Sequence, residues 1–163
     1  MQGRILPFLF ILVLLSDGCG KTAEQKSEEE RLNADVVRLH EHQMEEMAEI
    51  QDRINGIDVE LAHNDHLALQ HPKEIGERSA DDLITARKML LATKGAMTAW
   101  MKGYRPYSPS MQHDTAMASM TSDISSLLRI QASIDAARNA ANMALDTHRK
   151  LADRLAAAQS GKR

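Results

Sequence analysis

The spacing of apolar residues constrains the fold of this chain more than any other sequence feature. From Leu32 onward, apolar side chains recur at alternating intervals of three and four residues, which places them on one face of a helix. The same spacing returns after residues 63–78, which contain Pro72 and Gly76, and again after residues 105–109. Strand-forming residues are scarce, whereas Ala, Leu, Met, Glu, Lys and Arg are abundant. The sequence therefore predicts an all-α fold of three helices.

Local signals set the limits of the first two helices. The first is predicted from Leu32 to about Leu61. Ser79 and Asp82 have the spacing of a capping box, and Gly103 is a candidate C-cap. The second helix therefore lies between these two signals.

The third predicted helix begins at Ser108 and Pro109 and runs to about Ala158 with neither Gly nor Pro from residue 110 onward. Short connections make consecutive helices antiparallel neighbours. We therefore predict an up-down-up antiparallel three-helix bundle over residues 32–158, with a long third helix whose C-terminal part protrudes or packs on the first. An extended antiparallel coiled coil is the alternative.

The N-terminus has the features of an export signal. Arg4 precedes an apolar run over residues 5–15, which is too short to span a bilayer. Gly18 and Cys19 follow, and this segment resembles the bacterial lipobox, in which a small residue precedes an acylated cysteine. Ser16 and Asp17 depart from the usual lipobox pattern.

The cysteine count agrees with lipid attachment. Cys19 is the single cysteine, and an exported chain with one unpaired thiol is unusual because that compartment favours disulfides. We predict that residues 1–18 are a signal peptide, that Cys19 is lipid-modified and that residues 19–31 form a polar tether. No Asp follows Cys19 directly, which favours the outer membrane over the inner one. An ordinary signal peptide with an unused thiol is the alternative.

A pattern of His and Met residues is the strongest candidate for chemistry. The spacing His-x3-Met-x2-Met occurs in the first and third helices, and the second adds two Met residues that flank Trp100. Such spacing projects the side chains from one helical face, and the predicted topology brings all three groups to the end of the bundle nearer the membrane. The proposed ligands are His40, Met44, Met47, Met97, Met101, His113, Met117 and Met120.

Thioethers and imidazoles without a thiolate suit Cu(I), and by the same logic Ag(I), and Trp100 is a candidate cap for the bound cation. This ligand chemistry is similar to that of periplasmic copper and silver efflux chaperones. The alternative is that the Met residues only fill a core in which no Phe is available beyond the signal. In that case the chain is a non-catalytic structural or interaction lipoprotein with an unidentified envelope partner.

Other functions have weaker support. Glu60-x-x-His63 matches one half of a di-iron carboxylate site, but no second half is present. His63, His66 and His71 are expected to be solvated residues of the connection, together with Asp65. The alternative is that these four residues form a hard or borderline metal site there. There is no basic stripe or aromatic platform for nucleic acid, and no nucleophile–base pair or phosphate loop, so we predict a protein that is not an enzyme.

Two segments resemble a family of short bacterial helical lipoproteins sometimes labelled "viral A-type inclusion protein". That family carries an HDEVMPKM-like segment, matched here by His40, Met44 and Met47, and an AMMDWM-like segment, matched by Met97, Trp100 and Met101. The resemblance implies a lipoprotein with helical architecture and no established activity.

Overall fold

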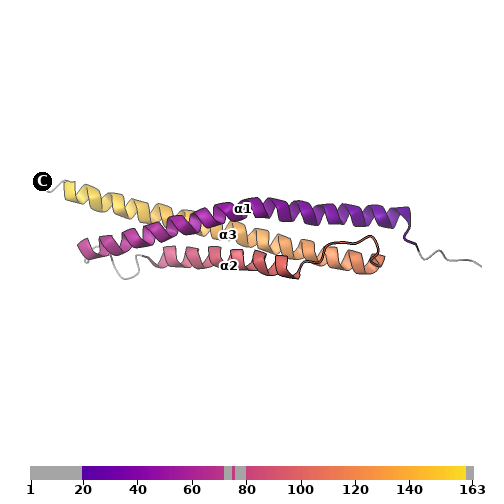
Figure 1. Ribbon diagram of the computed structural model, residues 1–163. Coiled ribbons are helices and arrows are strands. Elements are labelled where there is room, and N and C mark those ends of the chain that lie inside the picture. The colour runs from indigo at the N-terminus through magenta and orange to yellow at the C-terminus, as the bar shows by residue number, and fades with distance from the viewer. Residues whose placement is uncertain (1–19, 72–74, 76–79, 161–163) are drawn as a thin grey trace, which may run out of the picture.

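Three helices make up the computed structural model, which describes residues 20–71, 75 and 80–160 (Figure 1). Helix α1 spans Ala23–Gln70, α2 spans Asp81–Gly103 and α3 spans His113–Ser160. These residues form no strand, and each helix contacts the other two. The predicted all-α class is therefore confirmed for the described part of the chain.

Side-chain contacts run along the full length of the helices. Residues near the start of α1 contact residues near the start of α3, and residues near its end contact residues near the end of α3. The pairs are Glu29 with His113, Gln43 with Leu127 and Glu60 with His148. Contacts between α1 and α2 join late residues to early ones, namely Asp58 to Arg87 and Gln51 to Lys94. The start of α1 therefore lies beside the start of α3.

The buried residues recur every seven positions. This period keeps one seam of each helix facing its neighbours. In α1 the seam contains Glu29, Val36, Gln43, Ile50, Ile57 and Asn64, and in α3 it contains Met120, Leu127, Ile134, Ala141, His148 and Leu155. A buried seam thus extends along α1 and α3, with polar side chains at several of its positions.

Helix α1 begins earlier than the apolar pattern predicts, so the expected tether over residues 19–31 is wrong from Ala23 onward. Thr22 and Gln25 form a capping box: the Thr22 hydroxyl accepts from the Gln25 backbone N–H at 3.2 Å, and the Gln25 side chain accepts from the Thr22 N–H at 2.9 Å. This box satisfies two backbone donors and starts the helix within a polar stretch.

The connections also differ from the prediction. Helix α1 continues to Gln70, so His63 and His66 are helical rather than part of a loop. Ser108 and Pro109 lie in a turn closed by the hydrogen bond from the Met111 N–H to the Ser108 carbonyl, and α3 begins only at His113. The cap expected at Ser79 lies outside the described residues.

The last part of α3 packs on α1. Leu155 forms a small apolar cluster with Leu67 and with Ile75 from the connection between α1 and α2. In Figure 1 this part of α3 (yellow) continues past the beginning of α2, beside the end of α1. Of the two placements predicted for the end of the third helix, packing on the first is the one observed.

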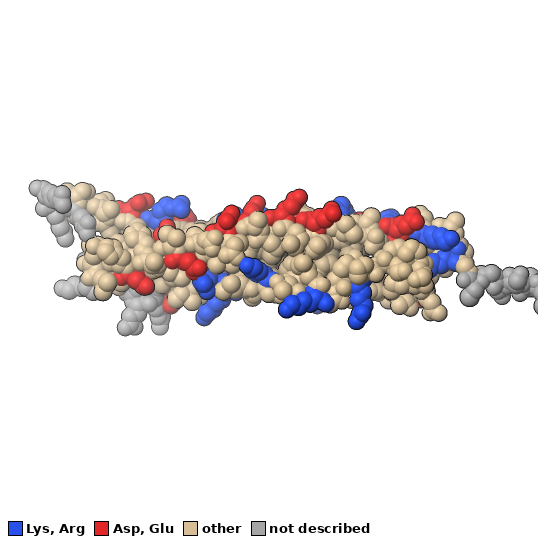
Figure 2. All heavy atoms as spheres, in the orientation of Figure 1, with Lys and Arg blue, Asp and Glu red and all other residues tan. Residues whose placement is uncertain are grey.

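Charge is unevenly distributed over the molecule. In Figure 2 acidic side chains line the middle of the edge formed by α1, where basic side chains also occur, and basic side chains project from the edge formed by α2. In sequence, α1 carries Glu41, Glu45, Glu46, Glu49 and Asp52, whereas α2 carries Arg87, Lys88, Lys94 and Lys102. Among the described helices, none combines the length and the apolar character needed to cross a membrane.

Two adjacent leucines test the seam. Leu127 is fully buried, whereas Leu128 is 54% exposed. We expect Leu127→Ala to lower the free energy of unfolding by about 2–5 kcal/mol, because it removes buried methyl groups and leaves a cavity. Leu128→Ala should change it by less than about 0.5 kcal/mol. Urea unfolding followed by circular dichroism measures both, and equal losses would contradict the proposed seam.

Candidate functional site

The eight predicted ligands are distributed between the core and the surface. Met97 and Met120 are buried in the core, and Met47 and Met117 are partly buried against it. Met44 and Met101 are 40% and 46% exposed. Residues at i and i+4 on one helical face can therefore differ in burial, as the buried Met97 and the exposed Met101 do.

His40 contacts Trp100. Their ring centroids are 5.3 Å apart, and Tyr104 stacks on Trp100 at 4.8 Å. Nε2 of His40 is enclosed and has no hydrogen-bond partner among the described residues, and neither has Oε1 of Gln43 one turn further along. Enclosed polar atoms without partners are costly, so a ligand bound to Nε2 of His40 would be stabilised.

Asp123 fixes the orientation of Trp100. The indole Nε1 of Trp100 donates to Oδ1 of Asp123 at 3.1 Å. Burial raises the pKa of Asp123, and this hydrogen bond partly opposes that effect. Burial and the charge of Asp123 also raise the pKa of Tyr104. Trp100, predicted as a cation cap, is therefore held between two aromatic rings and a carboxyl group.

His113 is directed toward a buried carboxylate. Glu29 is fully buried and accepts three hydrogen bonds: from Lys21 Nζ at 2.6 Å, from the Tyr107 hydroxyl at 2.6 Å and from His113 Nδ1 at 2.9 Å. Nζ of Lys21 also lies 5.6 Å from the centre of the Tyr107 ring. We call Lys21, Glu29, Tyr107 and His113 the Glu29 cluster. It joins the start of α1 to the connection between α2 and α3 and to the start of α3.

The cluster stabilises the ionised form of Glu29. Burial alone would raise the pKa of Glu29, but the hydrogen bonds from Lys21, Tyr107 and His113, with the charge of Lys21, lower it to about 2. The hydrogen bond to Glu29 is the main cause that raises the pKa of Tyr107 to about 12. The Glu29 carboxylate is thus ionised at all ordinary pH values.

The predicted lipid-attachment residue, Cys19, lies outside the described residues. Gly20 is the first described residue, and Lys21 follows it directly. The Glu29 cluster therefore binds the chain two residues after Cys19. The sequence prediction missed Glu29 because it assigned residues 28–30 to a solvated tether. The available signal was its position, seven residues before Val36 in the same repeat.

Glu60 and His63 both lie on α1, although His63 was expected in the connection. Their neighbour is a residue that the sequence did not single out. His148 of α3 is buried, and its Nδ1 lies 2.9 Å from Oε2 of Glu60. His66 is bonded to Gln70 at 3.1 Å. The backbone N–H of His71 caps the end of α1 through the Leu67 carbonyl. Asp65 is exposed, as expected.

No protein-family model, curated protein or solved structure matches this chain. The resemblance to short helical lipoproteins therefore stays a prediction.

The pH dependence of stability tests the Glu29 cluster. The pKa of Glu29 in the folded chain lies below the ordinary value of 4.5. Its ionised form therefore stabilises the fold fully above about pH 4.5, and this contribution is lost as the pH falls toward about 2. We expect Glu29→Gln to lower the free energy of unfolding at pH 7 and the difference from the parent chain to shrink between pH 4.5 and 2.

Urea unfolding at pH 7, 4.5, 3 and 2 measures that difference. Glu45→Gln, which changes an exposed glutamate on the same helix, is the matched control and should have little effect at any pH. A loss caused by Glu29→Gln that stays constant from pH 7 to pH 2 would argue against the assigned ionisation.

Proposed function

We propose that this chain is a lipid-anchored, non-catalytic protein of the bacterial cell envelope, built as an up-down-up antiparallel three-helix bundle with a long third helix. The observation that carries the proposal is the contact of Lys21 with the buried Glu29 carboxylate. With Cys19 acylated, residues 20–22 alone would separate the lipid from the start of α1. The bundle would then stand on its anchor through a short segment held by the Glu29 cluster.

The burial of Met97 and Met120 supports the version of this proposal in which the methionines bind no metal. Met97 and Met120 occupy seam positions that hold Leu90 and Leu127 one repeat away, and all four side chains are buried. An unbranched thioether fills such positions as an aliphatic side chain does. Met97 and Met120 therefore serve as packing residues of the core in this version of the proposal. The absence of an Asp after Cys19 favours the outer membrane as the location, and the envelope partner is unidentified.

Lipid attachment is tested in a bacterial host supplied with labelled palmitate. We expect the chain to incorporate the label and Cys19→Ser to lose it completely, because the acylated thiol is then absent. Ser27→Ala, which changes an exposed residue of α1, is the control and should keep the label. A parent chain without label, or a labelled Cys19→Ser variant, would contradict the anchor.

A second candidate function is favoured by one observation. The enclosed Nε2 of His40 has no hydrogen-bond partner in the described chain and sits on an imidazole against Trp100. Imidazole nitrogen and thioether sulfur suit Cu(I) and Ag(I). We propose His40 as the nitrogen ligand of such an ion. His113 is excluded as a ligand because Glu29 holds its ring.

An anaerobic competition titration with a Cu(I) chelator tests this candidate. We expect the chain to take Cu(I) from a chelator of micromolar affinity and His40→Phe to lower the affinity at least about tenfold, because a metal ligand is lost. His42→Ala removes a more exposed imidazole on the same helix and should leave the affinity unchanged. If the parent chain fails to compete, or if both variants lose affinity equally, the candidate is wrong. Unchanged affinity in a chain carrying both Met97→Leu and Met101→Leu would count against the ligand set predicted from the sequence.

A further inference from the structure

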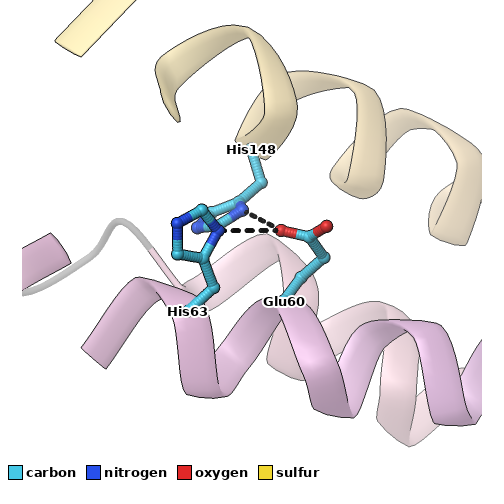
Figure 3. A group of neighbouring side chains, drawn as sticks. All are labelled: Glu60, His63 and His148. Atoms are coloured by element: carbon cyan, nitrogen blue, oxygen red, sulfur yellow. Dashed lines mark hydrogen bonds and ion pairs between the residues drawn. The ribbon is translucent and has the colours of Figure 1, made fainter. Parts of the chain in front are cut away.

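Two helices bring a carboxylate and two imidazoles together at the end of the molecule away from Lys21. Glu60 and His63 lie on α1, and His148 lies on α3 (Figure 3). One ligand atom from each of the three residues lies within 4.8 Å of the other two. Figure 3 shows both rings turned toward the same oxygen of Glu60. This group is separate from the Glu29 cluster and from His40.

The distances suit a small metal ion. Oε2 of Glu60 lies 2.9 Å from Nδ1 of His148 and 3.6 Å from Nδ1 of His63. Ligand atoms around a tetrahedral zinc ion are separated by about 3.4 Å, since each bond is about 2.0–2.1 Å long. The three side chains therefore need to move by only about an ångström or less to coordinate one ion.

His148 supplies the feature that distinguishes this group from an ordinary surface ion pair. It is 2% exposed, and its second ring nitrogen, Nε2, lies 3.3 Å from Oδ1 of the buried Asn64. Metal-binding histidines commonly donate their other ring N–H to an oxygen acceptor, which fixes the ring orientation. A metal ion on Nδ1 would replace the proton that the hydrogen bond to Glu60 requires.

Exposure leaves a route for the ion. The side chains of Glu60 and His63 are 24% and 46% exposed, whereas that of His148 is 1% exposed. The ion would therefore enter from the solvent side and keep a coordination position open to water or to a further ligand. Three protein ligands with one open position are typical of zinc sites that exchange ligands.

We propose that Glu60, His63 and His148 form a site for a divalent transition-metal ion of the Zn²⁺ class. Two nitrogen ligands and one oxygen ligand, without sulfur, favour Zn²⁺ over Cu(I), and the imidazoles disfavour Mg²⁺ and Ca²⁺, which prefer oxygen ligands. Coordination would join α1 to α3 near the end of the bundle. This proposal is independent of the lipid anchor and of the candidate copper site.

Isothermal titration of Zn²⁺ into the full chain in detergent tests the proposal, with Cys19→Ala present so that no thiol competes for the ion. We expect one Zn²⁺ to bind per chain. His63→Ala and Glu60→Gln should each weaken binding at least about tenfold. His63 is largely exposed, so its removal leaves the core intact. His66→Ala removes an exposed histidine from the same helix and is the matched control.

Thermal unfolding provides a second measurement. Zn²⁺ should raise the Tm of the chain and of its His66→Ala variant, but not of its His63→Ala variant, because a ligand bound only to the folded state stabilises that state. Mg²⁺ should raise none of them. The absence of saturable binding at one ion per chain, or equal losses with His63→Ala and His66→Ala, would overturn the proposal. Zinc binding unchanged by His40→Phe separates this site from the copper candidate.

Discussion

The seven-residue seam is the constraint on which the rest of the structure depends. It holds polar residues as well as apolar ones, and the Gln43 amide of α1 donates to the Leu127 carbonyl of α3 at 2.7 Å. The buried Thr93 of α2 likewise donates to the Ser133 carbonyl of α3 at 3.3 Å. Each such bond contributes only about 1 kcal/mol to stability. A polar residue in an apolar seam acts mainly on register, because a shifted pairing would bury it without a partner.

The apolar spacing predicts three helices correctly, and Gly103 marks the end of α2 as expected. The limits of α1 and the start of α3 differ from the prediction. Helix α1 starts at a capping box, Thr22 and Gln25, within a run of polar residues that carries no apolar pattern. Its far end passes His63 because no breaker occurs before Pro72. Local backbone hydrogen bonds and buried polar residues determine where α1 begins and ends. A search for apolar residues alone detects neither of these features.

Sequence spacing likewise could not predict which residues the fold brings together at the candidate sites. Spacing identifies Met97 and Met101 as neighbours on one helical face, but only packing decides that one is buried and the other is exposed. His148 is 88 positions from Glu60 in the sequence, and its place in the group depends on the register between α1 and α3. That register follows from the seam as a whole, so no local motif could reveal it.

The unbroken length of α1 gives the molecule a fixed dimension. A helix rises about 1.5 Å per residue, so the 37 positions from Ala23 to Glu60 correspond to about 55 Å. Charges are screened within about 8 Å at physiological salt. With Cys19 in a bilayer and α1 upright, residues near Glu60 would experience no field from the lipid headgroups. The helix would then act as a spacer. Its length could change without disrupting the seam only if seven residues were inserted or deleted in both α1 and α3.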